Sequence, residues 1–263
     1  MRENATTQIN VPSKGNPKLK SFLAAVNANE ELLQLWRCAN INAVDRSGMS
    51  DHGHVHVQIV ANAAYKILRL LIRGGVTPGV VANHGFDIED AGVVAVGASL
   101  LHDVGMAVQR ENHEIYGVPI ARDLLKSLLD PLYGMPERTI IASEILHCIV
   151  AHQTKEVCLT IEAGAVKVGD ALDLTEGRSR IPFEAGQVNI HSVSAQAIHS
   201  VDLSAGTEKP VHIDIHMNNY AGIFQVDELL RPKLLRSSIA PYVEVRALIS
   251  GESGRDLGVV YSL

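Results

Sequence analysis

Aromatic residues, cysteines and basic clusters are all scarce in this 263-residue sequence. Only 4% of the residues are aromatic, and no short segment is rich in Lys or Arg. A base-stacking surface and a basic patch for nucleic acid are therefore not expected. The net charge of −6 also disfavours contact with a phosphate backbone. We expect no nucleic-acid partner.

Features of secreted and membrane proteins are also missing. The cysteines Cys38, Cys148 and Cys158 are odd in number and form no C-x-x-C pair, which is typical of reduced thiols. The N-terminal residues lack the apolar core of a secretory signal. The longest apolar run, Ala91–Leu101, is about half as long as a bilayer span requires. We expect a cytoplasmic protein with no membrane segment.

Hydrophobic residues make up 46% of the chain, enough at this length for a substantial core. Apolar residues recur at helical spacing from about Leu19 to Thr175, and the pattern changes to alternation from Val188 onward. The sequence therefore predicts a mainly α protein with a small C-terminal α+β domain. We expect a flexible N-terminal arm over 1–17, a helical domain over 18–183 and the α+β domain over 184–263.

The individual elements follow from the same periodicities and from the Gly, Pro and Asp clusters between them. Helices are predicted at Leu19–Cys38, His54–Ile72, Ile88–His102, Asn112–Leu129, Glu137–Ala151, Glu156–Leu174 and Val226–Arg236. Strands are predicted at Val188–Gln196, Ile198–Ser204, Val211–Met217 and Tyr242–Ile249. The domain boundary is expected near Pro182–Gly186.

Histidines are concentrated in the helical part, where eight of the twelve lie between His52 and His152. Imidazole is the most common protein ligand for transition metals, and a mixture of His and Asp suits a divalent ion. His102 and Asp103 end an apolar helix, where the chain leaves helical geometry and adjacent side chains can converge. A buried carboxylate there requires a partner, which a metal could supply.

Two further residues occur in comparable apolar settings. His56 lies near the start of a helix, and Asp170 lies in a helical stretch that is otherwise largely apolar. Each has a structural alternative: His56 could bond a backbone carbonyl in the core, and Asp170 could pair with Lys167 or Arg178. The His102-Asp103 doublet could likewise only terminate its helix.

The order of these motifs resembles that of the HD-domain superfamily of metal-dependent phosphohydrolases. The similar segments begin at His56 with HVQIVANAA, at Leu100 with LLHDVG and at Val168 with VGDALD, and the resemblance spans about Leu19–Pro182. It implies an HD-type helical bundle in which four residues bind one metal: His56, His102, Asp103 and Asp170.

Additional histidines resemble those of HD proteins that hold two metals, namely His113, His147 and His152. His147 and His152 are about 140° apart on a helix, so both can serve one site only if that helix is distorted or the site is wide. The chain has His152-Gln153 where the HD-GYP subtype has two adjacent histidines, and it lacks the GYP segment. We therefore do not expect cyclic-di-GMP hydrolysis. One or two divalent ions are expected, drawn from Mn, Fe, Co, Ni, Zn and Mg.

Catalytic and substrate-binding roles follow for several residues. Asp103 is expected to orient or deprotonate the attacking water. Substrate phosphate could be bound by Lys155, Arg178 and Arg180, although these arginines could simply be solvated surface residues. His52 or His54 could protonate a leaving group, or lie in a surface loop. Asp173 could bind metal directly, cap the helix, or support one of the metal-binding residues without touching the metal.

We therefore expect a metal-dependent phosphohydrolase that acts on a small phosphorylated metabolite, with a nucleotide as the first candidate. The alternative is a catalytically silent sensor or scaffold that binds metal or nucleotide and signals through its C-terminal domain. A homodimer is also predicted, because an edge at Val211–Met217 could pair across a two-fold axis, although this edge could instead pack on the helical domain of its own chain.

Overall fold

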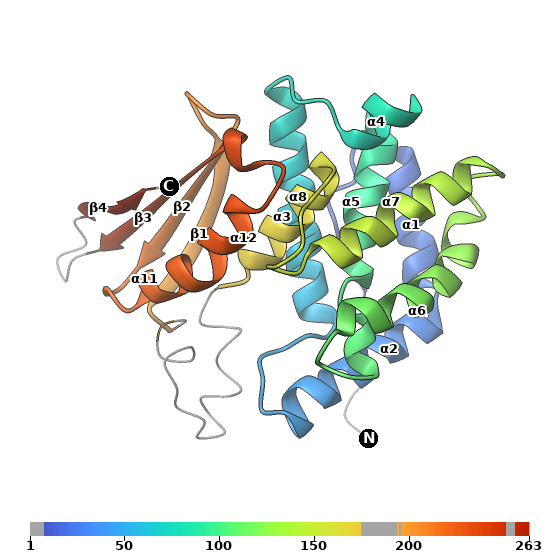
Figure 1. The fold of residues 1–263 in the computed structure, drawn as a ribbon, viewed down its shortest axis with the longest axis horizontal. Helices are drawn as coiled ribbons and strands as arrows, with labels where there is room; N and C mark the ends of the chain where they lie inside the picture. Colours follow the sequence, from blue (N-terminus) through green and yellow to red (C-terminus); the bar gives the residue numbers. More distant parts are fainter. Residues whose placement is uncertain (1–7, 175–193, 195, 251–255, 263) are drawn as a thin grey trace.

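A computed structural model describes residues 8–174, 194, 196–250 and 256–262. A helical bundle comes first along the chain, and a small sheet with short helices follows it. Figure 1 shows the sheet at one side of the bundle, with helix α12 next to α8. The predicted mainly α fold with a C-terminal α+β part is confirmed. The boundary expected near Pro182–Gly186 lies outside the described residues.

Eight α-helices form the described part of the bundle: α1 (Pro17–Asn27), α2 (Glu30–Asn40), α3 (His54–Arg73), α4 (Gly79–His84), α5 (Ile88–Leu101), α6 (His113–Leu129), α7 (Glu137–Ala151) and α8 (Ile161–Ala171). A π-helical turn, η1 (Ile41–Arg46), follows α2, and a 3₁₀ turn, η2 (Val104–Ala107), follows α5.

Capping side chains explain two differences from the predicted helices. The single helix expected over Leu19–Cys38 is two helices, because the Asn29 side chain accepts a hydrogen bond from Leu32 N and starts α2. The helix expected from Glu156 begins at Ile161, where Thr160 caps it by accepting from Ala163 N. The short helix α4 was not predicted, since it offers less than two turns of periodicity.

Three helices form the centre of the bundle. Helix α5 is buried from Asp90 to Leu101 without an exposed face, as expected for a helix that is apolar all round. Helix α3 packs against both α5 and α8. By length and composition α3 could cross a membrane, but 56% of its apolar window is buried inside the protein. It is therefore one of the core helices of the bundle, and it carries His56.

The N-terminal segment differs from the flexible arm that the sequence predicts. Ile9 and Val11 are buried in the core, with 3% of each exposed. The Asn27 side chain accepts a hydrogen bond from Ile9 N and donates one to Ile9 O. Burial of two apolar side chains and these paired hydrogen bonds hold the chain in place from residue 8 onward.

The C-terminal part contains a four-stranded sheet in the order β1 (Ile198–Ala205), β2 (Val211–Met217), β3 (Val243–Ser250) and β4 (Asp256–Ser262). The β2 and β3 strands are parallel, and the connection between them contains α11 (Gly222–Gln225), the π-helical turn η3 (Val226–Leu230), α12 (Arg231–Leu235) and the 3₁₀ turn η4 (Ala240–Tyr242). The apolar side chains of β2 lie on one face of the sheet and are buried, as the alternation predicts.

The position of β2 corrects one expectation. It pairs with β1 on one side and with β3 on the other, so it is a central strand and offers no edge for a second copy. The homodimer stays a prediction, without this route to it. The strand expected at Val188–Gln196 falls almost entirely outside the described residues. The β4 strand was not predicted.

The close packing of α3 against α8 at Gly169 can be tested by substitution. A Cβ atom at Gly169 would lie 2.9 Å from the backbone nitrogen of Ala64, so Gly169→Ala must push the two helices apart. We expect it to lower the free energy of unfolding by about 1–3 kcal/mol. The control Gly134→Ala, where a Cβ meets nothing within 4 Å, should change it by less than about 1 kcal/mol. Equal values by urea denaturation would contradict the proposed close packing.

Candidate metal centre

Six polar side chains from five helices and one turn converge inside the bundle. They form three overlapping groups of three residues. Within each group the possible ligand atoms lie within 4.8 Å of one another. Five of the six are buried, and only His113 is partly exposed. The cluster consists of His56, His102, Asp103, His113, His152 and Asp170. We call these residues the His/Asp cluster.

Helix ends orient two of its histidines in the same way. His102 follows the last residue of α5, and His152 follows the last residue of α7. In each ring Nδ1 hydrogen-bonds to the carbonyl three residues earlier, at 2.8 Å to Ser99 O for His102 and to Ile149 O for His152. These carbonyls belong to the last helical turn, where they lack intrahelical partners. Each bond leaves Nε2 directed into the cluster.

The other two histidines are held through Nδ1 as well. His113 begins α6, and its Nδ1 lies 2.9 Å from Arg110 O. His56, near the start of α3, has its Nδ1 2.6 Å from Asp173 Oδ2. A hydrogen bond from the second ring nitrogen to a carbonyl or carboxylate is typical of metal-binding histidines, since it fixes the tautomer. Asp173 therefore has the supporting position that the sequence left open.

The Nε2 atoms face one another at short range. They are 3.2 Å apart between His56 and His102, and 3.2 Å apart between His113 and His152. With the ring protons on Nδ1, both members of each pair present a lone pair, so they cannot hydrogen-bond to each other. A cation between these lone pairs would relieve the repulsion.

The carboxylate of Asp103 lies between the two histidine pairs. Its Oδ2 is 3.4 Å from His56 Nε2 and 3.2 Å from His102 Nε2, while its Oδ1 is 3.1 Å from His113 Nε2. The Oδ2 atom is buried and accepts no hydrogen bond within the described part of the chain. A buried carboxylate oxygen in this state is costly unless a cation binds it. The donor chemistry thus fits a divalent ion, which Asp103 would help to hold.

The two carboxylate oxygens of Asp170 have different partners. Oδ1 faces the cluster, 3.3 Å from His56 Nε2 and 3.8 Å from His102 Nε2. Oδ2 forms an ion pair with Lys233 of α12. The Lys167 ammonium, which the sequence offered as a partner, instead donates to Glu156 O.

Electrostatics inside the cluster favour ionised aspartates and a neutral His152, whereas contact with Asp103 outweighs burial and raises the pKa of His113. Burial acts to raise the pKa of Asp103, but its contacts with His102, His113 and His56 together hold that pKa well below the usual range. Burial has the same effect on Asp170, and there Lys233 and the nearby histidines lower the pKa. Burial and the neighbouring His102 lower the pKa of His152 to about 3. Ionised carboxylates and neutral imidazoles are the protonation states that bind metals.

The structure does not place His147 in the cluster. Its Nε2 instead accepts a hydrogen bond from Leu159 N at 3.1 Å. The regular helix α7 keeps His147 and His152 on different faces, which is the geometric conflict that the sequence already contained. Arg178 and Arg180 lie outside the described residues.

The remaining predicted residues lie around the cluster. The His52 ring centroid is 5.5 Å from that of His56, and its Nδ1 is 2.7 Å from Ser50 O. Lys155 Nζ lies 3.9 Å from Glu114 Oε1. His52 is thus beside the cluster, whereas Lys155 lies at the rim of a pocket next to it.

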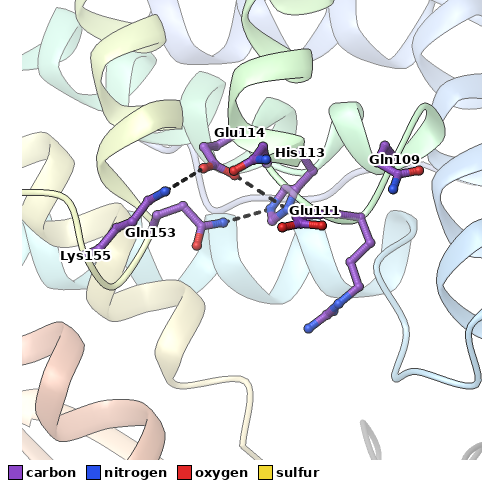
Figure 2. Close-up of a pocket in the computed structure, with 8 residues that line it drawn as sticks. Gln109, Glu111, His113, Glu114, Gln153 and Lys155 are labelled. Atoms are coloured by element: carbon purple, nitrogen blue, oxygen red, sulfur yellow. Dashed lines mark hydrogen bonds and ion pairs between the residues drawn. The ribbon is translucent and has the colours of Figure 1, made fainter.

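This pocket opens at His113 and has a volume of about 570 Å³. Figure 2 shows His113 in contact with both Glu114 and Gln153, and Lys155 pointing toward Glu114. The lining combines cations, carboxylates and amides: Gln109, Arg110, Glu111, Asn112, His113, Glu114, Gln153 and Lys155. A polar molecule could therefore reach one side of the cluster from solvent.

Two neighbours of the cluster were not predicted. The Gln153 Nε2 atom lies 3.2 Å from His113 Nε2 and 3.4 Å from His152 Nε2, so this amide approaches both rings. Its adjacency to His152 was a usable signal in the sequence. Lys233 had no such signal, because it lies 63 residues beyond Asp170 in a different part of the fold.

The support that Asp173 gives to His56 can be tested through metal binding. Asp173→Asn weakens the acceptor for His56 Nδ1, so we expect the affinity for Mn²⁺ to fall by about 10- to 100-fold. His147→Ala is the matched control, because His147 lies outside the cluster, and it should bind Mn²⁺ like the unmodified protein. Isothermal titration calorimetry measures both affinities. Unchanged Mn²⁺ affinity in Asp173→Asn would contradict the supporting role of Asp173.

Comparisons with known proteins agree with this geometry. The HD domain family profile matches residues 51–175, a range that includes the whole His/Asp cluster. The uncharacterized protein MJ1020 of Methanocaldococcus jannaschii is 38% identical over 224 residues, which cover 85% of this chain and 86% of that protein. No solved structure matches the chain.

Proposed function

The chain belongs to the HD domain family, and from that premise we propose that it hydrolyses a phosphoester in a small phosphorylated metabolite. A nucleotide is the first candidate substrate. One observation carries the proposal: four imidazole Nε2 atoms and two ionised carboxylates converge in a buried site that opens to a polar pocket. Metal-dependent hydrolysis requires such a donor set beside a route for substrate.

The residues of the cluster divide the chemical work. A divalent ion bound there would act as a Lewis acid and promote ionisation of water near neutral pH. Asp103 lies at the centre of the donors, where its carboxylate can orient the attacking water and accept its proton. The histidines cannot easily serve as acids, since their Nδ1 protons are already engaged.

The pocket beside His113 offers contacts for the rest of the substrate. Arg110 and Lys155 could bind further phosphate or acidic oxygens, and the amides of Gln109, Asn112 and Gln153 could bind a base or sugar. The lining also contains Glu111 and Glu114, so the pocket is not uniformly basic. This mixture favours a small molecule with both polar and anionic groups over a bare polyanion.

The proposal predicts turnover that depends on the cluster. The protein supplied with Mn²⁺ should hydrolyse at least one member of a panel of nucleotides and generic phosphoesters. His102→Ala combined with Asp103→Ala should lower the rate by about 1,000-fold or more, because the catalytic contribution of a metal amounts to several kcal/mol. Release of inorganic phosphate or mononucleotide, followed by chromatography, measures the rate.

His147→Ala is the control for this experiment and should keep the rate of the unmodified protein. Metal-dependent turnover that survives the double substitution would rule out the cluster as the active site. Tight nucleotide binding with no product after long incubation would instead support the sensor or scaffold alternative.

A further inference from the structure

The C-terminal part of the chain contributes a cation to the His/Asp cluster. Lys233 extends from α12 and contacts Asp170 Oδ2, while Oδ1 of the same carboxylate faces His56. The lysine lies beyond residue 175, where the family match ends. It is neither sealed in the core nor free in solvent, since 17% of its side chain is exposed.

The segment that carries Lys233 is anchored to the bundle at several points. Arg236 Nη1 donates to Lys155 O at 3.0 Å, and Ser238 Oγ donates to Thr160 O at 2.6 Å. Gly164 of α8 lies so close that a Cβ there would be 2.5 Å from Ser238 Oγ. These contacts join α12 to the loop before α8 and to α8 itself, which carries Asp170. The ammonium group is therefore held beside the cluster.

Its hydrogen-bonding capacity exceeds what Asp170 uses. An ammonium group has three donors, and among the described residues its contact is with the one oxygen, Asp170 Oδ2. The histidines contact the other oxygen, Oδ1, so the lysine does not compete with them for it. A phosphate bound at the cluster would bring anionic oxygens close to the remaining N–H groups.

We propose that Lys233 binds an oxygen of the substrate phosphate and that the C-terminal α+β part thereby completes the active site. This rests on the proposed function, because it assigns the phosphate of that substrate to the cluster. The competing role is purely positional: Lys233 would only hold Asp170 in place for the metal. In the first role loss of the lysine lowers the affinity for phosphate, and in the second it lowers the affinity for the metal.

Binding of inorganic phosphate to the full chain distinguishes them. Calorimetric titrations would first measure Mn²⁺ affinity, and then phosphate affinity at saturating Mn²⁺, for the unmodified protein and Lys233→Met. We expect the substitution to weaken phosphate binding by about 10- to 100-fold, as for loss of a hydrogen bond between charged groups. Mn²⁺ affinity should change by less than about threefold, and Lys233→Arg should restore part of the phosphate affinity.

The control Lys20→Met removes the same charge from an exposed position on α1 and should leave both affinities unchanged. Unchanged phosphate affinity in Lys233→Met at saturating Mn²⁺ would overturn the proposal, whatever happens to Mn²⁺ binding. A phosphate deficit that persists at Mn²⁺ saturation supports it. Because no turnover is needed, Lys233-dependent phosphate binding in a protein without hydrolytic activity would remove the proposed function but leave Lys233 as a phosphate-binding residue of the cluster.

Discussion

The lone pairs of four imidazoles and the charges of two carboxylates meet in a space that water hardly reaches, and this constraint shapes the helical part of the protein. Isolated burial of these groups would be costly. The fold offsets this cost partly through the Nδ1 hydrogen bonds, which use the carbonyls of Ser99, Arg110 and Ile149 and the carboxylate of Asp173. The remaining repulsion between Nε2 atoms is what a bound cation would offset.

The bundle and the sheet are connected around this centre. Helices α3 and α8 are brought into close contact at Gly169, directly before Asp170, so their spacing fixes how far Asp170 lies from His56. Helix α12 of the C-terminal part contacts the same carboxylate through Lys233. One side chain, Asp170, thus connects the bundle, the cluster and the C-terminal part.

The sequence predicted well what local periodicity and motif order determine. The long helices follow from apolar spacing, and the resemblance to HD-domain motifs implied that His56, His102, Asp103 and Asp170 lie near one another. Asn29 and Thr160 are capping signals that could have placed the ends of α2 and α8 more closely. The angle of about 140° between His147 and His152 on a regular helix was sufficient to exclude His147 from the cluster.

Other features depend on contacts between distant segments and could not be predicted. The pairing of β2 with both β1 and β3 depends on the path of the chain through α11 and α12, and alternation along one strand carries no information about its neighbours. Lys233 reaches Asp170 only because α12 packs on α8. The burial of Ile9 and Val11 likewise depends on core side chains from helices that come later in the sequence.

The hydrogen bonds to Nδ1 have a consequence for the thermodynamics of ion capture. Because each imidazole torsion is already fixed by a carbonyl or by Asp173, little rotational freedom is left to lose when an ion arrives. The entropic penalty of ordering the donors is met during folding of the polypeptide. Selectivity among ions should then depend on how well each ion fits the fixed positions of the donor atoms, since these atoms have little freedom to adjust.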